Sequence, residues 1–288
     1  MLSIDPKEIS TAHLHGYLLG AVAPRPICFA STIDSQGNVN LSPFSFFNVF
    51  SANPPVMVFS PARRVRDNTT KHTLENVREV PEVVINIVTF DMVQQMSLSS
   101  TEYDRGVNEF IKSGFMQIPS EKVKPPRVAE SPVQFECSVN QVIELGEAGG
   151  AGNLIVAEVV RLHLNETILD DDGKIDPFKI DTVARLGGNW YSRSREGLFE
   201  VEKPIRSLGI GVDGLPDSVR LSTVLTGNDL GMLGNIEQLP AEADYARWKI
   251  ELEGISTEEV HRMAQKILSQ GKTLEALQML MAKNNNSE

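Results

Sequence analysis

The chain has 288 residues, of which 41% are hydrophobic and 23% charged, and its formal net charge is −11. This length allows a sizeable core, the composition is typical of a globular protein, and no apolar run approaches the length that spans a membrane. The negative charge argues against a nucleic-acid-binding protein, and residues 1–6 lack the features of a signal peptide, so we expect a cytoplasmic protein without nucleic-acid or membrane partners.

The first predicted element is a β-hairpin. Ile27 to Ile33 is rich in apolar and β-branched residues, residues 34–38 supply turn formers, and Val39 to Leu41 returns to apolar character. Between residues 42 and 48, hydroxyl and amide side chains alternate with one proline and three phenylalanines. Such a segment suits an aromatic-walled groove for a planar ligand with polar edges, but it equally suits a barrel core in which the hydroxyls cap turns.

The next predicted strand, Val56 to Ser60, runs into a basic segment. Three arginines and one lysine fall within residues 63–71, among hydroxyl side chains, and an apolar periodic segment begins at Leu74. A strand, a loop of cations and hydroxyls, and a helix N-terminus together form a common type of phosphate site. A solvated basic loop is the alternative, but the cluster stands out in an acidic chain, so we favour an anion site.

The middle of the chain predicts more strand than helix. A glycine-rich loop over residues 146–152 is followed by a strand, whereas a dinucleotide-binding fingerprint needs a helix there, so we interpret the loop as a hairpin connection. The elements expected in this region are a buried strand over residues 81–89, a short helix over 90–98, a helical turn over 107–111 that ends at Gly114, and long strands over 131–145 and 154–164.

Histidine and cysteine positions give little sign of a metal site. His13 and His15 alternate as two residues on one strand face would, but no cysteine or acidic residue is spaced to complete a set of ligands. Cys28 and Cys137 lie in apolar, strand-like sequence, so we expect buried thiols and neither a disulfide nor a zinc site. The sequence therefore predicts no metal.

After residue 204 the sequence changes character. Ser256 to Glu259 forms a predicted capping box at the start of a helix, and an apolar stripe over Val260 to Leu268 supports that helix. A second helix continues from Leu274. We expect residues 205–288 to be a C-terminal extension whose two amphipathic helices dock on the rest of the chain, with dimer closure and binding of a partner protein as the alternatives.

Short motifs in a fixed order connect these elements over roughly residues 10–200. They are Pro24-Arg25-Pro26-Ile27, Ser31-Thr32, the segment Asn40 to Asn48, Pro54-Pro55-Val56 with Phe59-Ser60, Lys71-His72-Thr73 through Asn76, and Arg185-Leu186-Gly187-Gly188 followed by Tyr191. The ordered set resembles the flavin reductase-like, FMN-binding split-barrel family. His72 departs from the pattern, because members often carry Asp there, so we assign His72 no role.

The resemblance implies a mainly β fold with minor α content over residues 1–204: a six-stranded antiparallel Greek-key split barrel with peripheral helices. It also implies a homodimer that holds FMN near the subunit interface. Arg185 would approach the flavin or pin the loop that carries Gly187 and Gly188. By the same resemblance, the phosphate and ribityl chain contact Ser60, Arg64, Lys71 and Thr73, and the isoalloxazine ring lies against Asn40, Leu41, Ser42, Ser45 and Asn48, with Thr32 nearby.

The activity implied is that of an NAD(P)H-dependent flavin oxidoreductase, in which the cofactor carries the chemistry. FMN accepts hydride from the co-substrate NAD(P)H, and the electrons pass to a second flavin, an electron-acceptor protein or another acceptor. No catalytic side chain is required, which agrees with a sequence that shows a binding constellation and no nucleophile with its base. The alternative is an FMN-binding electron carrier or sensor without NAD(P)H turnover. A third hypothesis is a binding module in which the C-terminal helices recruit a partner.

Overall fold

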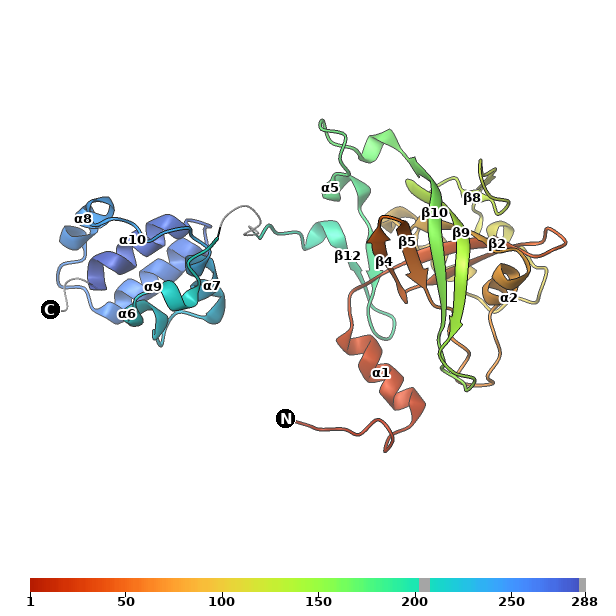
Figure 1. Ribbon diagram of the computed structural model, residues 1–288, viewed down its shortest axis with the longest axis horizontal. Coiled ribbons are helices and arrows are strands. Elements are labelled where there is room, and N and C mark those ends of the chain that lie inside the picture. The colour runs from red at the N-terminus through yellow and green to blue at the C-terminus, as the bar shows by residue number, and fades with distance from the viewer. Residues whose placement is uncertain (202–207, 285–288) are drawn as a thin grey trace. The chain divides into compact units, whose positions relative to one another are not determined.

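The computed structural model describes residues 1–201 and 208–284, which fall into two compact units, Met1–Phe199 and Glu200–Glu288 (Figure 1). The boundary predicted between residues 204 and 205 lies outside the described residues. None of the helices within the described ranges is long and apolar enough to cross a membrane.

The first unit is built on a seven-stranded antiparallel sheet with the order β3-β2-β6-β9-β10-β5-β4. The mainly β split-barrel class predicted from the sequence is confirmed. Six strands of this sheet were predicted, and the seventh is β4, because part of the aromatic segment forms an edge strand. The strands are β2 (Cys28–Ile33), β3 (Val39–Phe44), β4 (Phe47–Ala52), β5 (Pro55–Phe59), β6 (Glu82–Ile87), β9 (Val133–Glu144) and β10 (Asn153–Leu164).

Two small sheets complete the strands of this unit. One joins β1 (Arg25–Pro26), β11 (Val183–Arg185) and β12 (Tyr191–Arg193), and the other pairs β7 (Gln117–Ile118) with β8 (Arg127–Val128). In the first of these sheets, β1 and β11 pair so that two arginines, Arg25 and Arg185, lie opposite each other.

The core of the first unit follows from strand alternation. In β2, every residue is buried, and successive side chains enter different clusters. Cys28 packs with Ile85 and Cys137, whereas Phe29 packs with residues such as Phe110 of helix α4 (Glu109–Ser113). Complete burial of a phenylalanine contributes roughly 1.5–3 kcal/mol, so a central strand of this composition is held firmly on both faces. Both cysteines are buried free thiols, as predicted.

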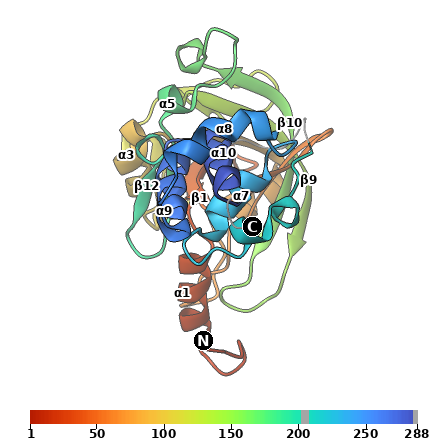
Figure 2. The same cartoon turned by 90° about the vertical axis from the view of Figure 1, so that its left-hand side faces the viewer.

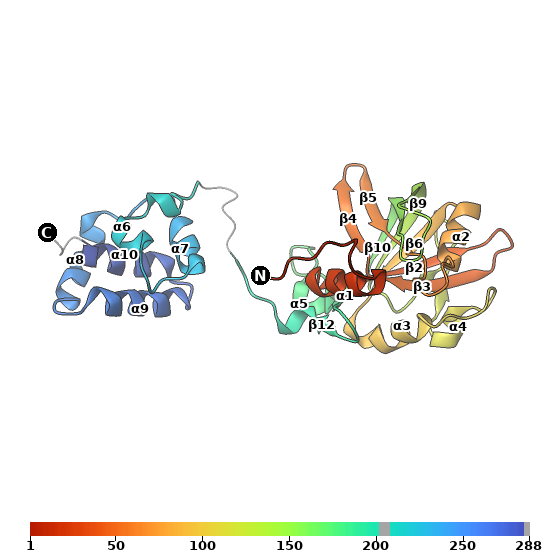
Figure 3. The same ribbon diagram turned by 90° about the horizontal axis from the view of Figure 1, so that it is seen from below.

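Short helices flank the sheet, and in Figure 3 strand β3 lies between α2 and the pair α3 and α4. Gly114 ends α4 in the left-handed region, with φ at 72°, as the sequence predicted. Residues 11–21 form a helix started by the Ser10 hydroxyl, so His13 and His15 do not lie on a strand. The helices are α1 (Thr11–Ala21), α2 (His72–Glu79), α3 (Val93–Ser99), α4 (Glu109–Ser113) and α5 (Pro177–Ile180).

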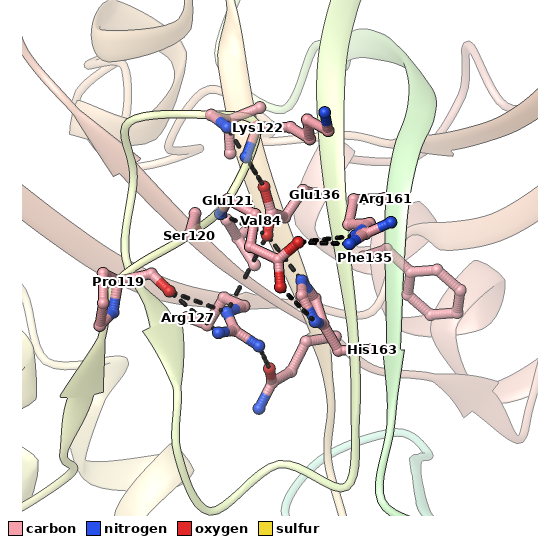
Figure 4. Close-up of polar contacts among 12 residues, drawn as sticks. Val84, Pro119, Ser120, Glu121, Lys122, Arg127, Phe135, Glu136, Arg161 and His163 are labelled. Atoms are coloured by element: carbon pink, nitrogen blue, oxygen red, sulfur yellow. Dashed lines mark hydrogen bonds and ion pairs between the residues drawn. The ribbon is translucent and has the colours of Figure 1, made fainter.

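A buried carboxylate fixes the loop over residues 119–127 to the β9–β10 hairpin (Figure 4). Glu136 is fully buried and accepts backbone N–H groups from residues 121, 122 and 123 at 2.6–3.2 Å. His163 Nε2 lies 2.6 Å from Glu136 Oε1, and Arg127 Nε lies 4.0 Å from the same oxygen. These donors compensate a charge that burial alone would make costly.

The second unit is helical and has its own core, which includes Leu233, Trp248, Val260 and Leu277. Figure 2 shows α10 in the middle of this unit. The two predicted helices are present as α9 and α10, and Ser256 caps α9 by accepting a backbone N–H at 3.2 Å. Three more were not predicted. The helices are α6 (Asp217–Arg220), α7 (Gly227–Gly234), α8 (Glu242–Glu251), α9 (Thr257–Leu268) and α10 (Thr273–Asn284).

Replacement of Gly209 by alanine is expected to destabilise the second unit selectively. A Cβ at this position would lie 2.6 Å from the backbone oxygen of Gly234, a contact that only backbone movement can relieve. Overpacking of this kind costs about 1–3 kcal/mol. Calorimetry should show a lower melting temperature for the second unit and an unchanged melting temperature for the first. Gly227→Ala is the control, because its Cβ would meet no atom within 4 Å; equal melting temperatures for both variants would contradict the expectation.

Candidate functional site

A small polar pocket lies at the N-terminal end of α2, between α2, β3 and the connection from α3 to α4. Most of its lining side chains carry a hydroxyl, an amide or a charge. Five of the eleven predicted site residues line it: Asn40, Ser42, Arg64, Lys71 and Thr73. The full lining is Asn40, Ser42, Arg64, Lys71, His72, Thr73, Ser99, Ser100, Thr101, Glu102, Tyr103 and Glu109.

Arg64 is held rigidly at the pocket. Its Nη1 donates to the Thr69 hydroxyl at 2.7 Å and to the Thr70 carbonyl at 2.8 Å, and its Nε donates to Glu102 Oε1 at 2.9 Å. The second oxygen of Glu102 accepts from Arg66 Nη2 at 2.9 Å. One carboxylate therefore bridges two arginines, and hydrogen bonds from Arg66 and Arg64 lower the pKa of Glu102.

Lys71 supplies a positive charge that is less well compensated than that of Arg64. Its side chain is partly buried, and its ammonium lies 5.7 Å from the ring centroid of Phe44. Burial lowers the pKa of Lys71, and the nearby Arg64 charge lowers it further. Among the ion pairs of the described residues, none includes Lys71. Lys71 is also the N-cap residue of α2, so its charge adds to that of a helix N-terminus.

The floor of the pocket is a buried chain of hydrogen bonds. The Thr73 hydroxyl donates to Asn40 Oδ1 at 2.8 Å, and Asn40 Nδ2 donates to Glu109 Oε1 at 2.8 Å. The other oxygen of Glu109 accepts the backbone N–H of Leu41 at 2.9 Å. Burial raises the pKa of Glu109. This chain of hydrogen bonds ties α2, β3 and α4 together. It forms the floor of the pocket, and Arg64 and Lys71 form what we call its basic rim.

The tip of the β9–β10 hairpin is hydrogen-bonded to the basic loop, which comprises residues 63–71. Gly150 donates its backbone N–H to the carbonyl of Arg63 at 3.0 Å, and Arg63 donates its own to the carbonyl of Ala151 at 2.8 Å. Gly149 packs so closely that a Cβ there would lie 3.0 Å from the carbonyl of Arg64. The glycines of this hairpin connection thus permit two backbones to run in contact.

Two predicted contact residues face the interior. The Thr32 hydroxyl is fully buried and accepts from Asn76 Nδ2 at 3.1 Å, and the Leu41 side chain is fully buried as well. Ser60 also lies behind the pocket, where its hydroxyl accepts the backbone N–H of Asn153 at 3.0 Å. These three side chains support the surrounding strands and do not line the pocket.

The remaining three predicted residues lie elsewhere in the first unit. The Ser45 hydroxyl is 3.4 Å from Arg25 Nε, and the Arg185 guanidinium lies 4.6 Å from the ring centroid of Tyr191. Asn48 is exposed on the edge strand β4, where its side chain accepts the N–H of the following residue. The structure therefore does not bring Ser45, Asn48 and Arg185 into the pocket.

Sequence reasoning missed two carboxylates of the pocket, Glu102 and Glu109. Glu109 contacts a strand that lies 68 residues earlier, and Glu102 contacts an arginine 38 residues earlier. Each looks like an ordinary surface charge in the sequence. The helical turn predicted near residues 107–111 was the one available signal, since it placed Glu109 in a structured element.

The donor set of the pocket fits an anionic phosphate ester. Arg64 and Lys71 provide charge, and Thr73 and the neighbouring hydroxyls provide neutral donors. The N-terminus of α2 adds free backbone N–H groups and the positive end of the helix dipole. A metal centre has no such support, since no group of three or more His, Cys, Asp or Glu within the described ranges could hold an ion.

Comparison with known proteins gives a consistent result. Residues 20–179 match the model of the flavin reductase like domain. A protein of Aquifex aeolicus is 36% identical over 188 residues, which is 65% of this chain and 93% of that one. The crystal structure of nitrilotriacetate monooxygenase component B from Bacillus cereus aligns with a TM-score of 0.64 and 29% identity, covering 70% of this chain and 98% of that one. A protein with a split barrel domain from Shewanella frigidimarina aligns with a TM-score of 0.60 at 24% identity, over 70% of this chain and 100% of that one.

Proposed function

This chain belongs to the flavin reductase like domain family, and from that premise we propose that it binds FMN and transfers hydride from NAD(P)H to the flavin. The observation that carries the proposal is the pocket at the start of α2. It places an arginine, a poorly compensated lysine and several hydroxyls together in a protein of net charge −11. Although Glu102 and Glu109 also line the pocket, charged and hydroxyl donors gathered at a helix N-terminus suit a phosphate-bearing ligand.

We assign the FMN phosphate to Arg64, Lys71 and Thr73. The isoalloxazine ring is assigned to the segment from Asn40 to Asn48, in which Ser42 lines the same pocket. Within that segment, Ser45 and Asn48 would contact the ring directly, whereas the buried Leu41, like Thr32 on the adjacent strand, supports the backbone from behind. Ser60 has the same supporting role for the basic loop.

The bound flavin would accept hydride from the nicotinamide and pass electrons to an acceptor. The task of the protein in this scheme is to bind and orient, and no side-chain acid or base is needed. The Bacillus cereus relative is, by name, component B of a monooxygenase, which supports an electron-acceptor protein as the partner of this chain. Arg185, outside the pocket, is assigned to the loop that carries Gly187 and Gly188.

An absorption spectrum, followed by reduction, tests the proposal. Protein as purified or reconstituted should show a flavin band, acid should release FMN, and anaerobic NADH or NADPH should bleach the band. A band that neither nucleotide bleaches would support an electron carrier or sensor instead. A protein that neither contains nor takes up flavin would contradict both functions.

We also propose that the first unit forms a homodimer through its exposed apolar surface. Edge strand β4 presents Val49 and Phe50, which are 56% and 69% exposed, and α1 presents Tyr17 and Leu18. Unpaired edges and exposed apolar groups of this kind are typical of surfaces that bind another chain. Phe46, the residue before β4, contacts His15 of α1, so the two surfaces adjoin.

Phe50→Glu is expected to convert the dimer to a monomer at micromolar concentration. In a two-fold interface the substitution acts twice, and each lost phenylalanine removes roughly 1.5–3 kcal/mol of burial. Light scattering coupled to size exclusion measures the mass. The control is Ile111→Glu on α4, an apolar residue that is 76% exposed and belongs to neither surface. A wild-type monomer, or equal masses for wild type and Phe50→Glu, would contradict the proposed interface.

A further inference from the structure

Glu102 occupies hydrogen-bond donors of two arginines at the pocket. Its carboxylate lines the pocket, and its two oxygens accept hydrogen bonds from two different arginines, each at 2.9 Å. We propose that Glu102 is an internal substitute for the FMN phosphate: it occupies the arginine-binding position in the free protein and is displaced when FMN binds. The inference rests on the proposed function, because it concerns the same pocket.

The hydrogen bonds of Arg64 make displacement necessary for a strong phosphate contact. Both bonds of Nη1 go to Thr69 and Thr70, which fixes the guanidinium in place. A phosphate that binds Arg64 through two parallel N–H groups needs Nε, and Nε donates to Glu102. Phosphate and the Glu102 carboxylate therefore compete for one donor.

Glu102 is suited to leave. Its side chain is 49% exposed, and Arg66, its second partner, is 72% exposed, so both ion pairs are weakened by solvent. The surrounding connection is anchored on both sides: the Thr101 hydroxyl donates to Leu98 in α3, and Arg105 pairs with Glu79 in α2. Rotation of one side chain toward water is sufficient, and the backbone can stay in place.

We expect this arrangement to favour ligands that carry a phosphate over ligands that lack one. An incoming phosphate gains Arg64 and the poorly compensated Lys71, and this gain offsets the loss of the Glu102 ion pairs. Riboflavin has no phosphate and leaves Glu102 in place. Removal of the Glu102 charge should therefore strengthen binding of phosphate-bearing ligands and leave riboflavin unchanged.

The test compares Glu102→Gln with wild type for FMN, riboflavin and inorganic phosphate, by flavin fluorescence quenching and by calorimetric titration. Loss of two solvent-weakened ion pairs corresponds to roughly three- to tenfold tighter binding of FMN and of inorganic phosphate. Riboflavin affinity should stay within about twofold, a change smaller than one weak ion pair. Unchanged circular dichroism and melting temperature show that the variant is folded.

Asp67→Asn is the matched control for charge at a distance. Asp67 Oδ2 accepts from the same Arg66 at 3.0 Å, yet Asp67 does not line the pocket. An equal gain for both variants would mean that net charge, and not occupancy, sets the affinity. Unchanged or weaker FMN binding in Glu102→Gln would likewise overturn the inference.

The arms of the experiment separate this inference from the proposed function. If neither flavin binds to any variant, the proposed function fails, and inorganic phosphate still decides whether Glu102 occupies an anion site. If wild type binds FMN more tightly than riboflavin but Glu102→Gln shows no gain, the proposed function stands and the inference fails.

Discussion

Replacement of Lys71 by methionine is expected to weaken FMN binding about ten- to a hundredfold, which corresponds to the roughly 1.5–3 kcal/mol of a hydrogen bond to a charged group. Methionine keeps an unbranched apolar side chain, while the charge and with it the cation–π contact with Phe44 are lost. Riboflavin affinity should hardly change. Arg64 is a less clean target, because its side chain also holds the basic loop through Thr69 and Thr70.

Fluorescence quenching with FMN and riboflavin measures this difference. Lys112→Met provides the control, since the Lys112 ammonium also lies over an aromatic ring, 5.5 Å from the centroid of Tyr103, but outside the pocket lining. Equal losses of both flavins in Lys71→Met would mean that Lys71 supports the fold. Equal losses in the two lysine variants would mean that the effect is one of net charge.

Glu136→Ala is expected to lower the stability of the first unit by about 2–4 kcal/mol, because it leaves four partly buried donors without their acceptor and opens a cavity. The control Glu121→Ala removes a half-exposed carboxylate paired with Arg161 at 2.9 Å and should cost less than about 1 kcal/mol. Calorimetry of the first unit measures both changes. A cost for Glu136→Ala no greater than that of the control would show that water replaces the lost acceptor.

The effect of Glu136→Ala should depend on pH. Burial raises the pKa of Glu136, but the hydrogen bonds from residues 121–123 and from His163 together outweigh burial and leave the pKa below its ordinary value. A carboxyl with a lowered folded-state pKa stabilises the protein above its unfolded-state pKa, and this stabilisation is lost as the pH falls through the folded-state value. The difference between wild type and variant should therefore be full at neutral pH and shrink in acid.

Local signals explain which elements could be predicted. Turn residues with Gly37 marked the β2–β3 hairpin, and Gly114 marked the end of α4, because both positions require a positive φ. Strand β4 was missed, since its aromatic and hydroxyl residues suit a ligand groove as well as an edge strand. Helix α1 buries none of its residues and so shows no apolar period. In α7, three glycines concealed a helix that a Thr226 capping box begins.

The basic side of the pocket could be predicted from the sequence, because strand, basic loop and helix are consecutive. The other half depends on contacts between distant segments. Ser45 and Arg185 are near Arg25 and not in the pocket, and the carboxylates that hold the floor and the rim, Glu109 and Glu102, carry no local motif. Such long-range pairs become visible only once the chain has folded.

The close contact between the β9–β10 hairpin tip and the basic loop has a consequence for how ligand affinity can change. The basic loop loses its conformational entropy when the protein folds, so ligand binding does not have to order it. Preorganisation of this kind is supplied by residues that the ligand never touches. A longer hairpin connection, or a side chain at Gly149, would make the basic loop of the free protein more mobile. Ligand affinity would therefore fall, although every residue assigned to the phosphate stays unchanged.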